Sequence, residues 1–191
     1  MKKVFIAILT ALTFVFLSES SLAGENYKNK TKQFSGSIGG FVPNSDDLDG
    51  YKDGANLSIS FNIQVSRIIG LGIDMNAYAS EPEGHTEGDL TSVGFEYLIY
   101  LQQAREKLQP YFAVGFGSYS NKIDSSVLEK KNGIGWGVVA KTGLKYFFDN
   151  DLFIGGYLKL FTNYQDIEDF GGTHTYNLGG AELNIEIGKR F

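Results

Sequence analysis

The two histidines of the sequence, His85 and His174, are the side chains best suited to act as a general base near neutral pH. Hydrolysis by a serine nucleophile would need such a base within hydrogen-bond reach of the hydroxyl group. The local strings are "GHTEG" and "GTHTY", and neither contains a serine. Both histidines lie in polar stretches between apolar segments, where solvated side chains are common. We therefore expect no catalytic residues and no enzymatic activity.

Carboxylates that could bind a metal ion are concentrated in two polar stretches. The stretch "VPNSDDLDGYKDG" contains four aspartates, and "SEPEGHTEGD" contains three glutamates and one aspartate. The first resembles part of a calcium-binding loop but lacks the complete D-x-D-x-D-G…E spacing. Cysteine is absent, which excludes disulfides and thiolate metal sites. We expect a solvated acidic rim, with no metal site and no cofactor.

A third group of charges recurs at every second position within apolar segments. Side chains of a β-strand alternate between two faces, so these segments each have one apolar and one polar face. The polar faces carry four acids and four bases: Asp74, Glu96, Glu182, Glu186, Lys141, Lys145, Lys159 and Arg190. Charges balanced in this way suit a structural network of ion pairs, and we expect that role rather than chemistry.

The segments that carry these charges predict eight strands. Their expected ranges are 33–41, 55–64, 71–79, 90–101, 110–119, 133–148, 152–164 and 178–191. Long polar connections follow the first, third, fifth and seventh strands, and shorter ones follow the second, fourth and sixth. With 24 glycines, 3 prolines and 14% aromatic residues, the composition also favours strands. The pattern predicts an all-β fold, an eight-stranded antiparallel up-and-down barrel.

The N-terminal segment has the layout of a secretory signal peptide. Two lysines precede the apolar run "VFIAILTALTFVFL", and small residues flank Leu22 near the expected cleavage site after Ala23. Fourteen apolar residues are fewer than the roughly 20 that a spanning helix needs. We expect residues 1–23 to be cleaved, 24–32 to form a short tail and 33–191 to form the barrel. A formal net charge of −5 argues against a nucleic-acid partner.

Alternation alone fits two kinds of barrel. A soluble barrel buries its apolar face, whereas a transmembrane barrel turns that face toward lipid. The signal peptide and the length of the strands favour the transmembrane barrel. Aromatic residues near strand ends on the apolar face, Trp136, Tyr146 and Phe148, are typical of an interfacial girdle.

The chain resembles the small bacterial outer-membrane β-barrels, such as the barrel of outer-membrane protein A and outer-membrane protein X. In that family the last strand ends in Phe after alternate apolar residues, and the barrel-assembly machinery reads this signal. In "AELNIEIGKRF" the matching residues are Leu183, Ile185, Ile187 and Phe191, while Lys189 departs from the pattern. The resemblance implies location in the Gram-negative outer membrane, a periplasmic tail, and periplasmic chaperones as further partners. It also implies contact with outer-membrane lipid and lipopolysaccharide, which divalent ions could bridge to the acidic loops.

The resemblance is compatible with several functions. The first is membrane integrity, or surface interaction through four extracellular loops with an unidentified partner, around a lumen filled by charged side chains. The alternative is a narrow channel for small hydrophobic compounds, similar to outer-membrane protein W, with Phe41, Tyr157 and Phe161 lining a funnel. A lipid A-modifying enzyme is a further possibility, but the lipid A deacylase and palmitoyltransferase rely on His with Ser, and the deacylase spacing is missing at both histidines.

Overall fold

The strands of the protein form one antiparallel sheet. A computed structural model describes residues 31–83, 88–102, 107–124, 131–169 and 172–191. The strands are β1 Lys32–Pro43, β2 Gly54–Gln64, β3 Ile69–Ser80, β4 Asp89–Gln102, β5 Leu108–Asp124, β6 Lys131–Phe147, β7 Leu152–Phe161, β8 Tyr164–Asp169, β9 Gly172–Asn177 and β10 Gly180–Arg190. A 3-10 turn, η2, spans Asp46–Leu48. The expected signal peptide lies outside the described residues, as does the tail up to residue 30.

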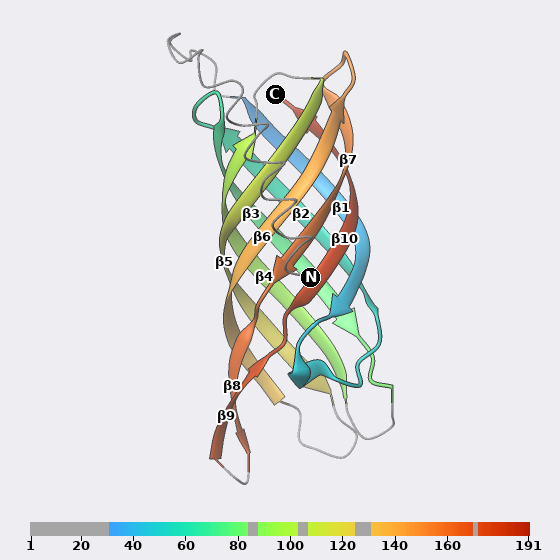
Figure 1. Ribbon diagram of the computed structural model, residues 1–191, viewed down its shortest axis with the longest axis vertical. Coiled ribbons are helices and arrows are strands. Elements are labelled where there is room, and N and C mark those ends of the chain that lie inside the picture. Colours follow the sequence, from blue (N-terminus) through green and yellow to red (C-terminus); the bar gives the residue numbers. More distant parts are fainter. Residues whose placement is uncertain (1–30, 84–87, 103–106, 125–130, 170–171) are drawn as a thin grey trace, which may run out of the picture.

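Eight of these strands close into a barrel, which confirms the predicted fold (Figure 1). Sequential neighbours pair from β1 to β7, and β10 pairs with both β7 and β1. At the seam, Ile38 of β1 lies opposite Ile185 of β10 and Leu57 of β2. Because the seam is hydrogen-bonded on both sides, the eight spanning strands leave no open edge among themselves.

The two faces of each strand are those predicted from the alternation. On β2, Leu57 and Ile59 are 59% and 47% exposed, whereas the neighbouring Ser58 and Asn62 are buried. The same inversion recurs around the barrel, with apolar side chains outside and polar ones inside. In a membrane the outer side chains contact lipid. No helix within the described ranges has the length and apolar character needed to cross a membrane.

The two ends of the barrel differ. The C-terminus and the short connections lie together at the upper end of Figure 1, and β8, β9 and η2 lie at the lower end. The fourth long connection, predicted as a polar loop, is instead the hairpin β8–β9. The predicted seventh strand therefore ends at Phe161 rather than residue 164. A polar hairpin outside the membrane has no apolar face, so alternating hydrophobicity did not predict it.

Candidate functional site

The lumen holds most of the charges expected there. Seven of the eight are buried: Asp74, Glu96, Lys141, Lys145, Lys159, Glu182 and Glu186. Arg190 is the last residue of β10, where its Nη2 is 2.8 Å from Asp151 Oδ1 and its guanidinium lies 4.3 Å from the ring centre of Phe147. Its partner is therefore a turn residue rather than another lumen charge.

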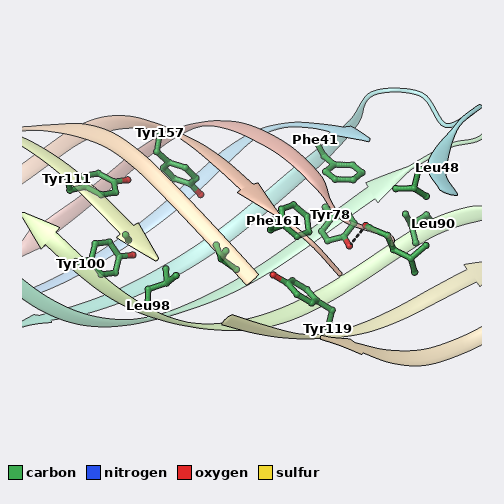
Figure 2. Packing of buried hydrophobic residues seen from close by; sticks show 13 residues of the cluster. Phe41, Leu48, Tyr78, Leu90, Leu98, Tyr100, Tyr111, Tyr119, Tyr157 and Phe161 are labelled. Atoms are coloured by element: carbon green, nitrogen blue, oxygen red, sulfur yellow. Dashed lines mark hydrogen bonds between the residues drawn. The ribbon is translucent and has the colours of Figure 1, made fainter. Parts of the chain in front are cut away.

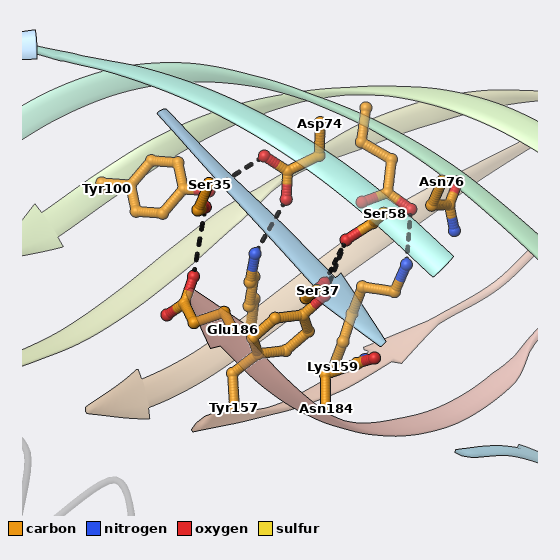
Figure 3. Close-up of polar contacts among 12 residues, drawn as sticks. Ser35, Ser37, Ser58, Asp74, Asn76, Tyr100, Tyr157, Lys159, Asn184 and Glu186 are labelled. Carbon is orange, nitrogen blue, oxygen red and sulfur yellow. Dashed lines mark hydrogen bonds and ion pairs between the residues drawn. The ribbon is translucent and has the colours of Figure 1, made fainter. Parts of the chain in front are cut away.

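Two groups of ion pairs cross the middle of the lumen (Figure 3). Lys159 Nζ, from β7, lies 2.9 Å from Glu96 Oε1 of β4 and 2.9 Å from Glu182 Oε2 of β10. Lys141 Nζ, from β6, lies 2.9 Å from Asp74 Oδ2 of β3. Each group joins strands on different sides of the barrel, and together they fix the lumen walls to one another. The sequence placed these residues on the inner face but did not determine which would pair.

Lys145 and Glu186 have mainly neutral partners. Lys145 donates to Gln33 Oε1 at 2.9 Å and lies 4.7 Å from the ring centre of Tyr111. Glu186 accepts hydrogen bonds from Tyr111 at 3.1 Å and from Ser35 at 3.3 Å. The amide, ring and hydroxyl groups therefore take the place of direct opposite charges.

Buried aromatic rings form a layer in the lumen (Figure 2). On β7, Phe161 of this layer lies two residues beyond Lys159, on the side of β8 and the long connections. Phe161 stacks with Tyr119 at 5.6 Å between ring centres and meets Tyr78 edge-on at 5.3 Å. The ring centres of Phe41 and Tyr78 are 4.4 Å apart. Sequence reasoning placed Phe41 and Phe161 on the inner face but missed Tyr78 and Tyr119, although extending the same alternation by one step on β3 would have found Tyr78.

Tyr157, the third residue considered for an apolar funnel, belongs to a polar cluster. Its hydroxyl lies 2.8 Å from Ser37 Oγ and 2.9 Å from Ser58 Oγ (Figure 3). The ring also packs beneath Lys141, whose Nζ is 3.9 Å from the ring centre. These contacts fill the lumen from β1, β2 and β7.

Amide side chains lie inside the barrel, between the aromatic layer and the mouth formed by the long connections. Asn163 donates to Tyr78 at 2.7 Å and to Asn121 at 2.8 Å, and Asn121 donates to Gln165 at 2.8 Å. The Tyr78 hydroxyl in turn donates to the Leu178 carbonyl at 2.8 Å (Figure 2). The network links β3, β5 and the base of the β8–β9 hairpin.

The first long connection folds across this mouth. Leu48 of η2 is 3% exposed and joins the buried cluster. Ser45 Oγ donates to the Asn177 carbonyl at 2.6 Å, and Asp47 accepts from the Asn177 amide at 2.8 Å. The connection is thereby fixed to the end of β9.

The first and second connections are also joined to each other. The Lys52 amide donates to the Glu81 carbonyl at 2.8 Å, and the Glu83 amide donates to the Gly50 carbonyl at 2.6 Å. Tyr51 donates from its hydroxyl to the Gly88 carbonyl at 2.9 Å. Where it is described, the acidic rim expected from the sequence is therefore a folded surface. We call it the acidic platform, and it includes Asp49, Asp53, Glu81 and Glu83.

The predicted girdle residues lie on the outer face. Trp136 is exposed near the long connections, beside its β8 partner Tyr164. Tyr146 and Phe148 are exposed near the short turns, with ring centres 5.4 Å apart. Beside them, Lys107 forms a 2.8 Å ion pair with Asp149, which lowers the pKa of that carboxyl group and raises the pKa of the lysine.

The predicted assembly signal forms the end of the closing strand. Leu183, Ile185 and Ile187 are exposed on the outer face of β10. The Phe191 amide donates to the Lys32 carbonyl at 2.8 Å, and the Phe191 ring lies 5.4 Å from Lys189 Nζ. The lysine that departs from the sequence pattern therefore sits over the terminal ring.

The histidines do not form a site within the described residues. His85 lies outside those residues, and His174 is exposed on β9. Across the described ranges, no group of three or more His, Cys, Asp or Glu side chains is arranged to hold a metal ion.

Comparison with known proteins agrees with the geometry. The family model described as outer membrane protein beta-barrel domain matches residues 7–191. Neisserial surface protein A superposes with a TM-score of 0.60 at 15% identity, covering 84% of this chain and 97% of that one. Ail, the attachment invasion locus protein of Yersinia pestis, gives a TM-score of 0.52 at 14% identity, covering 85% and 98%. No curated protein matches the sequence.

Proposed function

The chain belongs to the outer membrane protein β-barrel domain family and is an outer-membrane β-barrel, and from this premise we propose that it binds a surface partner through its extracellular connections. The filled lumen supports this proposal more than any other observation. Ion pairs, an aromatic layer and the folded first connection occupy the path that a channel would need. Function then lies outside the lumen, where loops carried by a rigid scaffold can bind.

The filled lumen predicts an electrically silent barrel. Purified protein reconstituted into a planar bilayer should give no steady conductance above the empty-bilayer baseline, because moving an ion through would require breaking buried pairs such as Lys159–Glu96. A porin recorded in the same bilayers provides the positive control. Steady, protein-dependent conductance would reject the closed lumen and favour the narrow-channel alternative.

The chemistry of the connections indicates the kind of partner. The first connection contains Asp46, Asp47, Asp49 and Asp53, and the second contains Glu81 and Glu83. Ail has been solved with sucrose octasulfate, a heparin analogue, which is a polyanion. An acidic platform would repel such a ligand and attract a basic surface. We therefore propose an electropositive protein surface as the partner.

Neutralising the platform should weaken adhesion. Cells that display the protein with Asp49→Asn, Asp53→Asn, Glu81→Gln and Glu83→Gln should bind polylysine-coated beads several-fold less than cells with the unchanged protein, because the attracting charge is lost. The measurement is bead retention at low salt and again at high salt, where screening should reduce the difference.

The control for this experiment is a charge change at the other end of the barrel. Asp149→Asn removes a carboxylate from a short turn that faces the periplasm in this proposal. It should leave bead retention unchanged. Equal loss in both variants, or none in either, would contradict binding by the platform.

Other partners follow from the proposed place of the protein. The exposed outer face would contact outer-membrane lipid and lipopolysaccharide. The barrel-assembly machinery would read Phe191 with the apolar residues of β10, after delivery by periplasmic chaperones. We propose no enzymatic role, since no serine accompanies either histidine in its local string.

A further inference from the structure

Four buried oxygen atoms that face the lumen accept no hydrogen bond from the part of the chain that the structure describes. They are Glu96 Oε2, Asn56 Oδ1, Asn76 Oδ1 and Asn184 Oδ1. Their residues are between 0% and 4% exposed. Buried polar atoms nearly always have a partner, so four acceptors on the inner faces of β2, β3, β4 and β10 need an explanation. Within the described ranges, the other buried polar atoms without a partner include both donors and acceptors, such as Asn62 Nδ2 and Gln102 Oε1.

The lack of hydrogen-bond donors to these oxygens does not result from the orientation of the amide groups. The nitrogens of Asn76 and Asn184 both donate to Glu182, each at 3.4 Å. The nitrogen of Asn56 donates to the Gly40 carbonyl at 3.3 Å. Turning any of these amides would place its oxygen against another acceptor, so the free oxygens are fixed as acceptors.

The strand register places these residues on the inner faces of β10, β2, β3 and β4. Asn56 and Asn184 lie on either side of Gly39, and Asn184 Oδ1 occupies the space that a Cβ on Gly39 would need. Asn76 lies opposite Gly94, two residues before Glu96 on β4. Asn76 Oδ1 occupies the space that a Cβ on Gly94 would need, and its nitrogen donates to Glu182, which pairs with Lys159.

The charges buried in the described part of the lumen do not balance. Among the described residues, Glu96 and Glu182 both pair with Lys159. Over the seven buried charges, four are carboxylates and three are ammonium groups. The excess negative charge thus includes Glu96, whose Oε2 is one of the oxygens without a donor. Unpaired charge in a protein interior is costly, and a bound cation would offset it.

We propose that the lumen binds one monovalent alkali cation beside Glu96 Oε2, with ordered water linking it to the amide oxygens. A donor set made only of oxygens suits hard cations. A single free carboxylate oxygen among amide carbonyls supplies too little charge for calcium, which takes several carboxylates. The described residues also include no carboxylate group arranged for a metal ion, whereas neutral amide oxygens suit a weakly held ion of single charge.

Anomalous diffraction would locate the cation. Crystals of the full barrel grown with thallium(I), which substitutes for potassium, should show one anomalous peak beside Glu96 Oε2. Glu96→Gln should abolish the peak. The matched control is Glu186→Gln, which removes the same charge from a buried residue outside the group and should leave the peak in place. Water alone at the position, or a peak that survives Glu96→Gln, would overturn the proposal.

A solution measurement covers the case in which Glu96→Gln does not fold. The unfolding midpoint of the unchanged protein should be higher in potassium or sodium chloride than in N-methylglucamine chloride at equal ionic strength, because a ligand of the folded state stabilises it. N-Methylglucamine is too large to enter the group. Asn184→Leu, which removes one oxygen and no charge, should reduce this difference. Equal midpoints in all three salts would reject the cation.

Discussion

Replacing Lys159 by methionine is expected to lower the free energy of unfolding by about 3–5 kcal/mol, because it leaves two buried carboxylates without their cation. Lys159 is 2% exposed and contacts both Glu96 and Glu182 at 2.9 Å. Removing one partner of a buried ion pair costs far more than the pair contributes in total. The measurement is urea unfolding of the purified barrel, followed by the gel mobility of unheated samples. Buffers should lack alkali ions, which could replace the lost charge.

The matched control removes the whole group of charges. Adding Glu96→Gln and Glu182→Gln to the lysine change should recover most of the lost stability, since a neutral, well-packed replacement of a buried ion group is often tolerated. If Lys159→Met alone lowers the free energy of unfolding by less than about 1 kcal/mol, water must reach the two carboxylates and solvate them.

Phe161→Ala is expected to lower the free energy of unfolding by about 3–5 kcal/mol, the usual result of truncating a buried phenylalanine. Its ring contacts those of Phe41, Tyr78 and Tyr119 and lies 4.7 Å from Lys159 Nζ. The surrounding side chains relax only partly around the space that is left. The same unfolding measurement applies.

Phe116→Ala provides the comparison on the opposite face. Phe116 is 59% exposed on the outside of β5, where lipid chains can fill the space left by its ring. Phe116→Ala should therefore lower the free energy of unfolding several-fold less than Phe161→Ala does. Equal losses would mean that the aromatic layer is less tightly packed than the ring contacts indicate.

The barrel could be predicted because its signal repeats in every strand. Apolar side chains at alternate positions, as in β2 and β10, require one face in lipid and one inside. This argument also placed Asp74 and Lys141 on one face, since period two is a property of the strand itself. It could not pair them, because pairing depends on how the strands tilt and close around the lumen.

The outer mouth was less predictable for a related reason. The β8–β9 hairpin is polar on both sides, so no periodic signal separates it from a loop. Arg190 was expected among the lumen charges, but its strand ends at the barrel rim, where Asp151 of the neighbouring turn is closer. The packing of Leu48 depends on contacts between connections far apart in sequence.

The pairing of β1 with β10 determines when the protein can finish folding. Gln33 lies opposite Arg190, so β1 meets this partner only after β10 has been made. Contacts so distant in sequence form slowly, because a long loop must be closed before they stabilise anything. Until then β1 has an unpaired edge that can join another chain. Protection of that edge between synthesis and closure is therefore a kinetic requirement of this architecture, whatever the stability of the finished barrel.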